Sequence, residues 1–231
     1  MMTNLNRRQF LTATAAVTAA ATPALAIEPL QRTLPHFSGL SMTSYSLKPH
    51  MRWWWSKPTD GKLDMLAFLD YCAELGLDGA ELTSYFFETP VERTYINRIK
   101  RRAHLLGLDI TGGAMGNNFG HPPDSEVTRQ QMQSFRPWLD HFADMGAPVV
   151  RVFASKSPPK DATDEQVIAN VTANLEQALA YAERRGVMLG LENHDFVKNI
   201  DYLLTILRAI DSRWLGVIWD SANLAPIPMQ N

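Results

Sequence analysis

The sequence predicts an α/β fold of repeated strand–helix units, namely a (β/α)₈ TIM barrel of which about six units are present. Amphipathic segments end on a glycine just before a short apolar run, at positions 76, 107, 146 and 186. Glycine closes a helix C-terminus at little steric cost, and the spacings of 31, 39 and 40 residues each suit one strand–helix unit. The apolar runs predict six parallel strands: Leu40–Tyr45, Gly79–Thr83, Asp109–Gly112, Val149–Phe153, Met188–Glu192 and Gly216–Asp220.

A barrel is favoured over an open doubly wound sheet by the residues that follow the strands. No Gly-x-Gly-x-x-Gly pattern follows the first strand, whereas polar residues follow several strands, as in a barrel whose site is assembled from many strand ends. A complete barrel takes about 250 residues, and 205 follow the signal segment at 1–26. We therefore expect the last two units to be missing. Such an open barrel exposes two strand edges, which predicts a homo-oligomer or aggregation.

The first 26 residues predict an export signal rather than part of the fold. Asn6-Arg7-Arg8-Gln9-Phe10-Leu11 is a twin-arginine (Tat) pattern, an Ala/Thr/Val run follows it, and Ala24-Leu25-Ala26 is a small-x-small cleavage site. The apolar run is too short and too rich in Ala and Thr for a good membrane span. We expect a periplasmic or other extracytoplasmic protein with no stable membrane span after cleavage. The predicted divisions are a signal at 1–26, a linker at 27–38 and an incomplete barrel domain at 39–231.

Local patterns predict two helix starts and one core cysteine. Thr89-Pro90-Val91-Glu92 predicts a threonine cap with proline at the first helical position. Thr163-Asp164-Glu165-Gln166 matches a capping box. The single cysteine, Cys72, cannot form an internal disulfide, and its apolar helix face predicts a core position.

Composition limits the class of partner. The chain is 45% hydrophobic and 20% charged, which is ordinary for a globular protein with a sizeable core. Its formal net charge is −2 and no basic stripe stands out, so nucleic acid is not an expected partner.

Three carboxylates stand directly after apolar residues that look fully buried. They are Glu81 in Asp78-Gly79-Ala80-Glu81-Leu82, Glu192 in Leu189-Gly190-Leu191-Glu192-Asn193-His194, and Asp220 in Val217-Ile218-Trp219-Asp220-Ser221-Ala222-Asn223. A buried charge costs several kcal/mol unless it is paired or binds a metal. One such carboxylate indicates an ion pair. Three at the same place in a repeated unit indicate one shared polar site.

These stretches, with Val149-Val150-Arg151-Val152-Phe153 between them, resemble the xylose isomerase-like TIM barrel superfamily. That superfamily includes sugar-phosphate isomerases and epimerases, tagatose-type 3-epimerases, inosose dehydratases and endonuclease IV. The resemblance implies a divalent metal (Mn, Mg, Zn or Co) at the mouth of the barrel. Glu192 matches the metal-binding glutamate of strand five, and Asp220 matches the aspartate of strand six. The histidine of strand seven and the glutamate of strand eight fall in the part expected to be missing, so we expect at most weak metal binding by this chain.

The resemblance also implies roles around this centre. Glu192 is the candidate general base, and His194 is a candidate acid, base or substrate contact, with a loop role as the alternative. Asn223 contacts a substrate hydroxyl or shapes a turn, and Asp220 is otherwise a helix N-cap. Glu81 is a substrate-side or structural carboxylate. Arg151 is a substrate-binding candidate that alternatively neutralises Glu81 or Glu192 across the interior.

Aromatic residues follow the first predicted strand, on the side where a barrel carries its site. Tyr45 and the run Trp53-Trp54-Trp55 offer flat faces for the C–H face of a sugar. Tyr45 and Trp54 are therefore substrate-binding candidates. The alternative is a hydrophobic lid or a subunit contact.

The leading hypothesis is an exported sugar isomerase or epimerase that uses divalent-metal-assisted proton transfer on a ketose or related sugar. One alternative is a lyase or hydrolase that acts on a modified sugar on the same scaffold. Another is a non-catalytic carbohydrate-binding protein. The enzymatic expectation applies to the full-length form, and the missing units leave open whether this chain is itself active. The expected partner is a small-molecule sugar.

Overall fold

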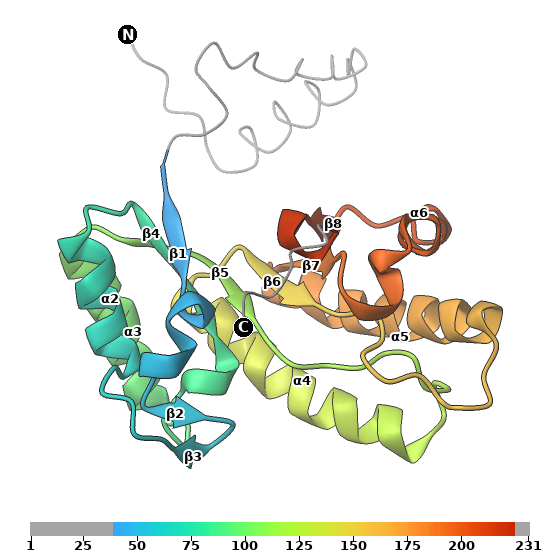
Figure 1. Ribbon diagram of the computed structural model, residues 1–231, viewed down its shortest axis with the longest axis horizontal. Coiled ribbons are helices and arrows are strands. Elements are labelled where there is room, and N and C mark those ends of the chain that lie inside the picture. The colour runs from blue at the N-terminus through green and yellow to red at the C-terminus, as the bar shows by residue number, and fades with distance from the viewer. Residues whose placement is uncertain (1–38, 225–231) are drawn as a thin grey trace, which may run out of the picture. The chain divides into compact units, whose positions relative to one another are not determined.

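Six parallel strands form one sheet in the computed structural model, which describes residues 39–224 (Figure 1). The order in the sheet is β1-β4-β5-β6-β7-β8, which is the order of these strands along the chain. The predicted signal and linker, and residues 225–231, lie outside the described residues. The strands are β1 (Ser41–Thr43), β4 (Gly79–Thr83), β5 (Asp109–Ala114), β6 (Val149–Val152), β7 (Met188–Glu192) and β8 (Leu215–Ile218).

The six predicted strands are confirmed, but the bounds of β1, β5, β6 and β8 differ from the prediction, and β5 runs two residues further, to Ala114. Tyr45 belongs to the 3₁₀ turn η1 (Ser44–His50), because the chain leaves β1 after Thr43, whose hydroxyl accepts from the Tyr45 N–H. Phe153 lies just past β6. Asp220 lies past β8, where its side chain caps the 3₁₀ turn η4 (Ser221–Asn223).

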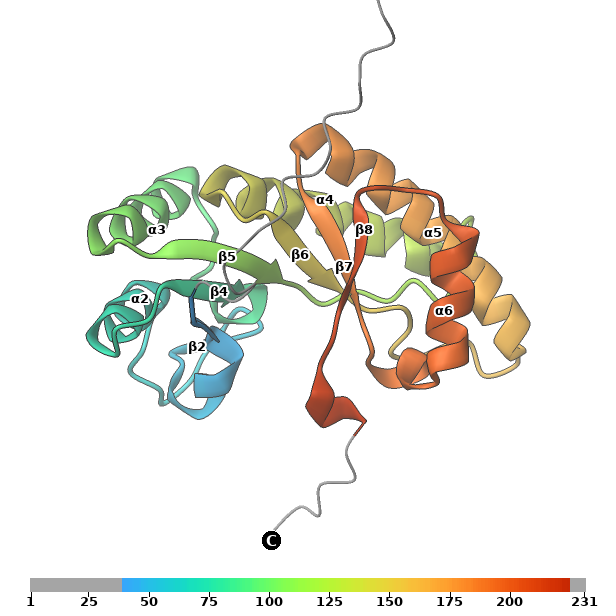
Figure 2. The ribbon, with the colours of Figure 1, turned by 90° about the horizontal axis from the view of Figure 1, so that it is seen from above.

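Within residues 39–224, five helices lie along the outer side of the curved sheet (Figure 2). In the described residues β1 and β8 do not pair with each other, so the sheet is open at both strands. None of the helices in residues 39–224 is long and apolar enough to cross a membrane. The helices are α2 (Met65–Glu74), α3 (Arg93–Leu106), α4 (Glu126–Met145), α5 (Asp164–Arg185) and α6 (Ile200–Ala209).

Most of the predicted helix boundaries are confirmed. Helices α3, α4 and α5 end on Gly107, Gly146 and Gly186, which all have the left-handed backbone that closes a helix. The capping box of Thr163 and Gln166 is present at the start of α5. The predicted cap at Thr89 is wrong: α3 begins at Arg93, and the three residues before it are not helical.

The core lies between the sheet and its helices. Leu82 of β4, Val152 of β6 and Leu191 of β7 are fully buried. Cys72 of α2 is also fully buried, as predicted, and burial raises the pKa of its thiol to about 11. A thiol with this pKa is not a reactive group at neutral pH.

A register shift separates the two halves of the β4–β5 pair. Ala80 pairs with Ile110, but Glu81 pairs with Gly112, so β5 carries one extra residue. Beyond the shift, Glu81 of β4 lies beside Gly112 of β5, and Thr83 pairs with Ala114.

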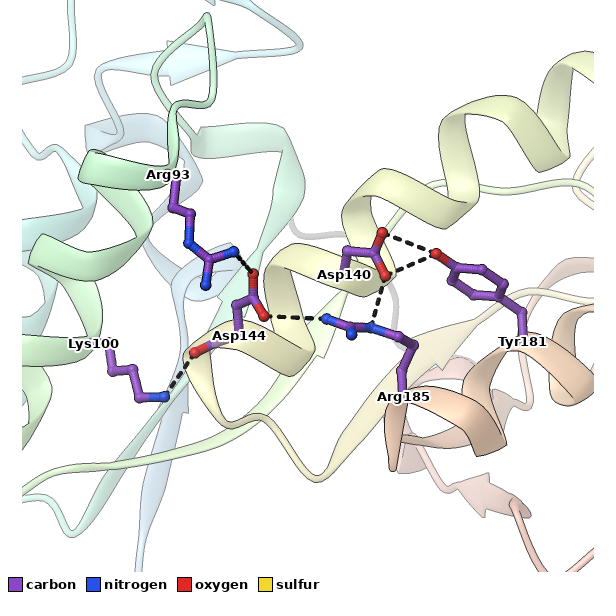
Figure 3. Close-up of polar contacts among 6 residues, drawn as sticks. All are labelled: Arg93, Lys100, Asp140, Asp144, Tyr181 and Arg185. Atoms are coloured by element: carbon purple, nitrogen blue, oxygen red, sulfur yellow. Dashed lines mark hydrogen bonds and ion pairs between the residues drawn. The ribbon is translucent and has the colours of Figure 1, made fainter.

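Polar contacts join the outer faces of three neighbouring helices (Figure 3). Asp144 of α4 forms ion pairs with Arg93 of α3, with Nη1 2.9 Å from Oδ2, and with Arg185 of α5, with Nη2 3.1 Å from Oδ1. Arg185 also pairs with Asp140 at 2.8 Å. The set is completed by Tyr181, whose hydroxyl donates to Asp140, and by Lys100, which donates to the Asp144 carbonyl oxygen. These side chains are partly exposed, so each pair contributes little and the network acts mainly by linking α3, α4 and α5.

Candidate functional site

A cavity of about 650 Å³ opens at the carboxyl ends of the strands. Side chains two residues apart on a strand point to the same side of a sheet. The cavity is accordingly lined by pairs with this spacing from four strands and their ends: Glu81 and Thr83, Arg151 and Phe153, Glu192 and His194, and Ile218 and Asp220. All three carboxylates that the sequence singles out thus line one cavity.

Glu192 and Arg151 form a buried ion pair at the centre of this lining. Arg151 Nε lies 3.1 Å from Glu192 Oε2, and both side chains are 11% exposed. Arg151 Nη1 also donates to the Met115 carbonyl oxygen at 2.8 Å, and its guanidinium lies 3.9 Å from the centre of the Phe153 ring. Of the two carboxylates that the sequence offers as partners, Arg151 therefore pairs with Glu192 and not with Glu81.

Asn223 completes the contacts of the Glu192 carboxylate. Its side-chain amide donates to Glu192 Oε1 at 3.1 Å, from the turn η4 beyond β8. Oε1 therefore accepts this hydrogen bond while Oε2 lies in the ion pair with Arg151, so both carboxylate oxygens are engaged.

Asp220 is held in place by a neighbour that the sequence analysis missed. Asn193 is fully buried; its side-chain amide donates to the Asp220 carbonyl oxygen at 2.8 Å, and its oxygen accepts from the Asp220 N–H at 2.7 Å. The Asp220 side chain caps η4 by accepting from the Ala222 N–H at 2.8 Å. The alternative role of Asp220 as an N-cap is therefore confirmed.

His194 has an acidic neighbour that the sequence analysis also missed. Its Nδ1 lies 2.8 Å from Asp195 Oδ2, and its ring lies 4.8 Å from the Phe153 ring. The two polar atoms are close but poorly aligned, so neither has a good hydrogen-bond partner although both are buried. Asp195 has a φ of 47°, a backbone conformation that costs about 1–3 kcal/mol and is often found at functional sites.

Glu81 and Thr83 face the cavity from β4. Within residues 39–224, no Lys, Arg or His nitrogen lies within 4.0 Å of the half-buried Glu81 carboxylate. The Thr83 hydroxyl is fully buried and has no hydrogen-bond partner among these residues. A buried polar atom without a partner costs about 1–3 kcal/mol, which a hydrogen-bonding ligand would recover.

An aromatic cluster forms another part of the lining. Trp54 packs 5.6 Å from both Tyr85 and Phe86, with Lys48 Nζ 4.3 Å from its ring centre. Tyr45 lies 6.4 Å from Trp54. Tyr45 and Trp54 both line the cavity, as predicted, and so does Tyr85, which the sequence analysis missed. Burial raises the pKa of Tyr85, and the neighbouring Arg151 opposes this shift.

The described residues alone do not fit a metal centre. A divalent cation needs several oxygen or nitrogen ligands around one point. Across residues 39–224, no group of three His, Cys, Asp or Glu side chains is placed to hold a metal ion. Both Glu192 oxygens are engaged by Arg151 and Asn223, and Asp220 Oδ1 caps a turn.

Several solved structures share this fold. The D-psicose 3-epimerase from Clostridium cellulolyticum H10 matches with a TM-score of 0.61 and 17% identity, over 78% of this chain and 62% of its own. The 3-keto-D-glucoside 4-epimerase from E. coli matches with a TM-score of 0.57 and 18% identity, over 78% and 72%. A probable 3-DHS dehydratase from Bacillus anthracis matches with a TM-score of 0.60 and 14% identity, over 78% and 62%.

The length of this chain differs from that of such structures. Three that it matches are covered over only 59%, 62% and 64% of their own length. At these identities the likeness shows the fold alone.

Comparison with family models is more direct. No curated protein matches the chain. A model of the twin-arginine translocation signal sequence matches residues 4–24, which confirms the predicted signal. A model described as xylose isomerase-like TIM barrel matches residues 69–227, more than half of the chain and all of the cavity-lining strands from β5 to β8. The chain therefore belongs to the xylose isomerase-like TIM barrel family.

Proposed function

We propose that this protein, exported by its Tat signal, binds a sugar that carries a carbonyl group and moves a proton on the carbon beside that group. The observation that carries the proposal is the Glu192 carboxylate, which is oriented at both oxygens inside a cavity with polar and aromatic walls. The likeness in fold to proteins named as sugar epimerases supports the same reaction class.

The proposed step begins when a Glu192 oxygen takes the proton from the carbon next to the carbonyl. The C–H electron pair then forms a carbon–carbon double bond, and the carbonyl π pair moves to oxygen, which gives an enediolate. Delivery of a proton to the opposite face by a second group yields an epimer. Transfer of the abstracted proton from Glu192 to the former carbonyl carbon, with the hydroxyl proton of the first carbon passing to the enediolate oxygen, yields an isomer. As Glu192 becomes neutral, Arg151 loses its anionic partner and its donors turn to the developing oxyanion.

The Glu192–Arg151 pair compensates the charge of a base that is only 11% exposed. The contacts with Arg151 and Asn223 also hold the carboxylate in one orientation before substrate arrives. The His194–Asp195 pair lies beside it in the same cavity and supplies the second proton-carrying group.

Metal assistance is a finer part of the proposal and rests on family membership. Glu192 and Asp220 would supply two oxygen ligands to a Mn, Mg, Zn or Co ion. Because the described residues do not complete such a site, no step above depends on it.

The reaction is tested by incubating the full chain with a panel of keto-sugars in D₂O, with and without Mn²⁺, and following deuterium uptake by NMR. We expect uptake at the carbon beside the carbonyl, and a loss of about 10²-fold or more in Glu192→Gln because the base is removed. Glu176→Gln, on the exposed face of α5, is the matched control and should exchange at the wild-type rate. Absence of exchange across the panel in the wild-type protein would reject proton transfer.

A lyase is the second candidate, and the His194–Asp195 pair favours it. An acid beside Glu192 would protonate a leaving hydroxyl after the same proton abstraction, so that water is lost. A structure named as a probable dehydratase has the same fold. Mass analysis of the products separates the two reactions, because a lyase product is lighter by one water or is cleaved.

A further inference from the structure

One tryptophan of the run at 53–55 has an unusual backbone and position. The short strands β2 (Trp53–Trp54) and β3 (Lys57–Pro58) form a hairpin whose two loop residues, Trp55 and Ser56, have φ values of 51° and 64°. A two-residue loop with both φ values positive is favoured by Asn-Gly, not by a bulky aromatic residue. The turn alone therefore does not explain a tryptophan at this position.

The surroundings of Trp55 hold its indole flat at the cavity. The ring stacks on Tyr85, with centroids 4.0 Å apart and planes inclined by 27°. The backbone N–H of Trp55 also donates to the Tyr85 carbonyl oxygen at 2.9 Å. The edge of the ring lies over Gly116, where an added Cβ would come within 2.4 Å of Trp55 Cη2. Trp55 is nevertheless 49% exposed and lines the cavity. One face of the indole is thus covered by Tyr85 while a large part of the ring stays open.

The neighbouring tryptophans are placed differently. Trp54 is surrounded by Tyr45, Tyr85 and Phe86, with Lys48 over its ring, so its faces are already used. Trp53 is half-buried and does not line the cavity. Only Trp55 of the three combines a ring fixed in place with an accessible face on the cavity.

The stacked pair of Trp55 and Tyr85, called the shelf from here on, lies in the same lining as the proposed reacting groups. Tyr85, on which Trp55 stacks, lines the cavity together with Arg151, whose charge lowers the pKa of the Tyr85 hydroxyl against the larger effect of burial. Arg151 in turn pairs with Glu192. The shelf and the carboxylate therefore belong to one continuous lining.

We propose that the stacked pair of Trp55 and Tyr85 binds a closed sugar ring whose carbonyl stands on a ring carbon, and that Trp55 selects such pyranosides over open-chain ketoses. A closed pyranose presents a flat C–H face, which packs on an aromatic ring with its polarised hydrogens toward the negative π face. An open-chain sugar has no such face. The inference deepens the proposed function: it rests on that function for the class of ligand and names the form in which the sugar is bound.

The test measures binding, so it is independent of turnover. Methyl pyranosides of the gluco, galacto, manno and xylo series cannot open, and each is compared with its alditol by titration calorimetry on the full chain. We expect at least one pyranoside to bind about tenfold more tightly than its alditol, which corresponds to one well-placed aromatic contact. Trp55→Asn keeps a residue suited to the left-handed turn but removes the ring, and it should lose that preference. Trp55→Phe should retain most of it.

Trp53→Phe is the matched control and should bind as the wild type does. Pyranoside binding that is unchanged in Trp55→Asn, or alditols bound as tightly as pyranosides, would overturn the inference while leaving the deuterium-exchange result to judge the proposed reaction. Binding that depends on Trp55 without any exchange would support the shelf and reject the reaction. Failure of the wild-type chain to bind any pyranoside overturns the inference, whatever the exchange assay gives.

Discussion

Asn193 and Asp220 exchange two hydrogen bonds, at 2.8 Å and 2.7 Å, across the ends of strands β7 and β8. The buried amide of Asn193 thereby extends the pairing of the two strands by one more residue. This contact fixes Asp220 at the start of the turn that carries Asn223, whose amide donates to Glu192. An asparagine that contacts no solvent thus positions two site residues.

Replacing this amide tests how much of the site depends on it. Asn193→Asp keeps the shape but loses the donor to the Asp220 carbonyl oxygen, and it places a negative charge beside that oxygen. We expect a loss of about 1–3 kcal/mol in the free energy of unfolding, since a buried acceptor is left unpaired. Urea denaturation measures it, with the exposed Asn97→Asp as control. Equal stability of the two variants would show that the two Asn193–Asp220 hydrogen bonds do not stabilise the fold.

The Arg151–Glu192 pair should be far more sensitive than a surface pair. Arg151→Gln leaves a buried carboxylate uncompensated, so we expect a loss of roughly 3–5 kcal/mol. Arg129→Gln breaks an exposed pair with Glu126 and should change the stability far less, because water screens that pair. Denaturant titration of both variants gives the comparison. The double variant Arg151→Gln with Glu192→Gln should regain part of the loss, because the buried charge is then gone.

Stability should fall in mildly alkaline solution because of Cys72. Its pKa is raised by burial to about 11 in the folded chain, from 9.0 in the absence of burial. Between these values the unfolded chain releases the thiol proton and the folded chain keeps it, so the free energy of unfolding falls as pH rises. The change amounts to about 2–3 kcal/mol when pH has passed both values. Urea denaturation from pH 7 to pH 10 measures the slope, and Cys72→Ala should have a flatter one. Parallel slopes would contradict this assignment.

Divalent cations should stabilise the folded chain if Glu192 and Asp220 supply ligands. We expect Mn²⁺ to raise the melting temperature in a concentration-dependent way. Asp220→Asn should abolish the shift while still capping η4, because asparagine is a good N-cap. Asp124→Asn, at an exposed position, is the control. A shift of the same size in Asp220→Asn would place any bound ion elsewhere.

The fold was predictable because its signals are local. The bounds of β4 and β7 agree with the prediction at both ends, since each is a short apolar run closed by a helix-ending glycine before it and polar residues after it. The capping box at Thr163 satisfies backbone groups within four residues, so sequence alone identifies it. The start of α3 was missed because a Thr-Pro pattern suits a turn as well as a helix.

The site was predictable in its strand-end residues but not in their partners. Glu81, Glu192 and Asp220 are recognisable in the sequence because each places a charge directly after an apolar run. Asn193 and Asp195 carry no such signal, because their roles arise from the register of neighbouring strands and from a left-handed backbone. The sequence gives no reason to prefer Trp55 over Trp53 or Trp54, because its position depends on the hairpin turn and on stacking with Tyr85.

Strand β5 contributes a small side chain to the cavity where the neighbouring strands contribute charged ones. Past its register shift with β4, this strand lines the cavity with Ala114, and an added Cβ at Gly112 or Gly116 would meet Val149 or Trp55. The charged groups stand on β4, β6 and β7 and just past the end of β8. The size of an accepted ligand and the chemistry applied to it therefore depend on different strands. A larger side chain at Ala114 would narrow the cavity and leave the charged groups unchanged.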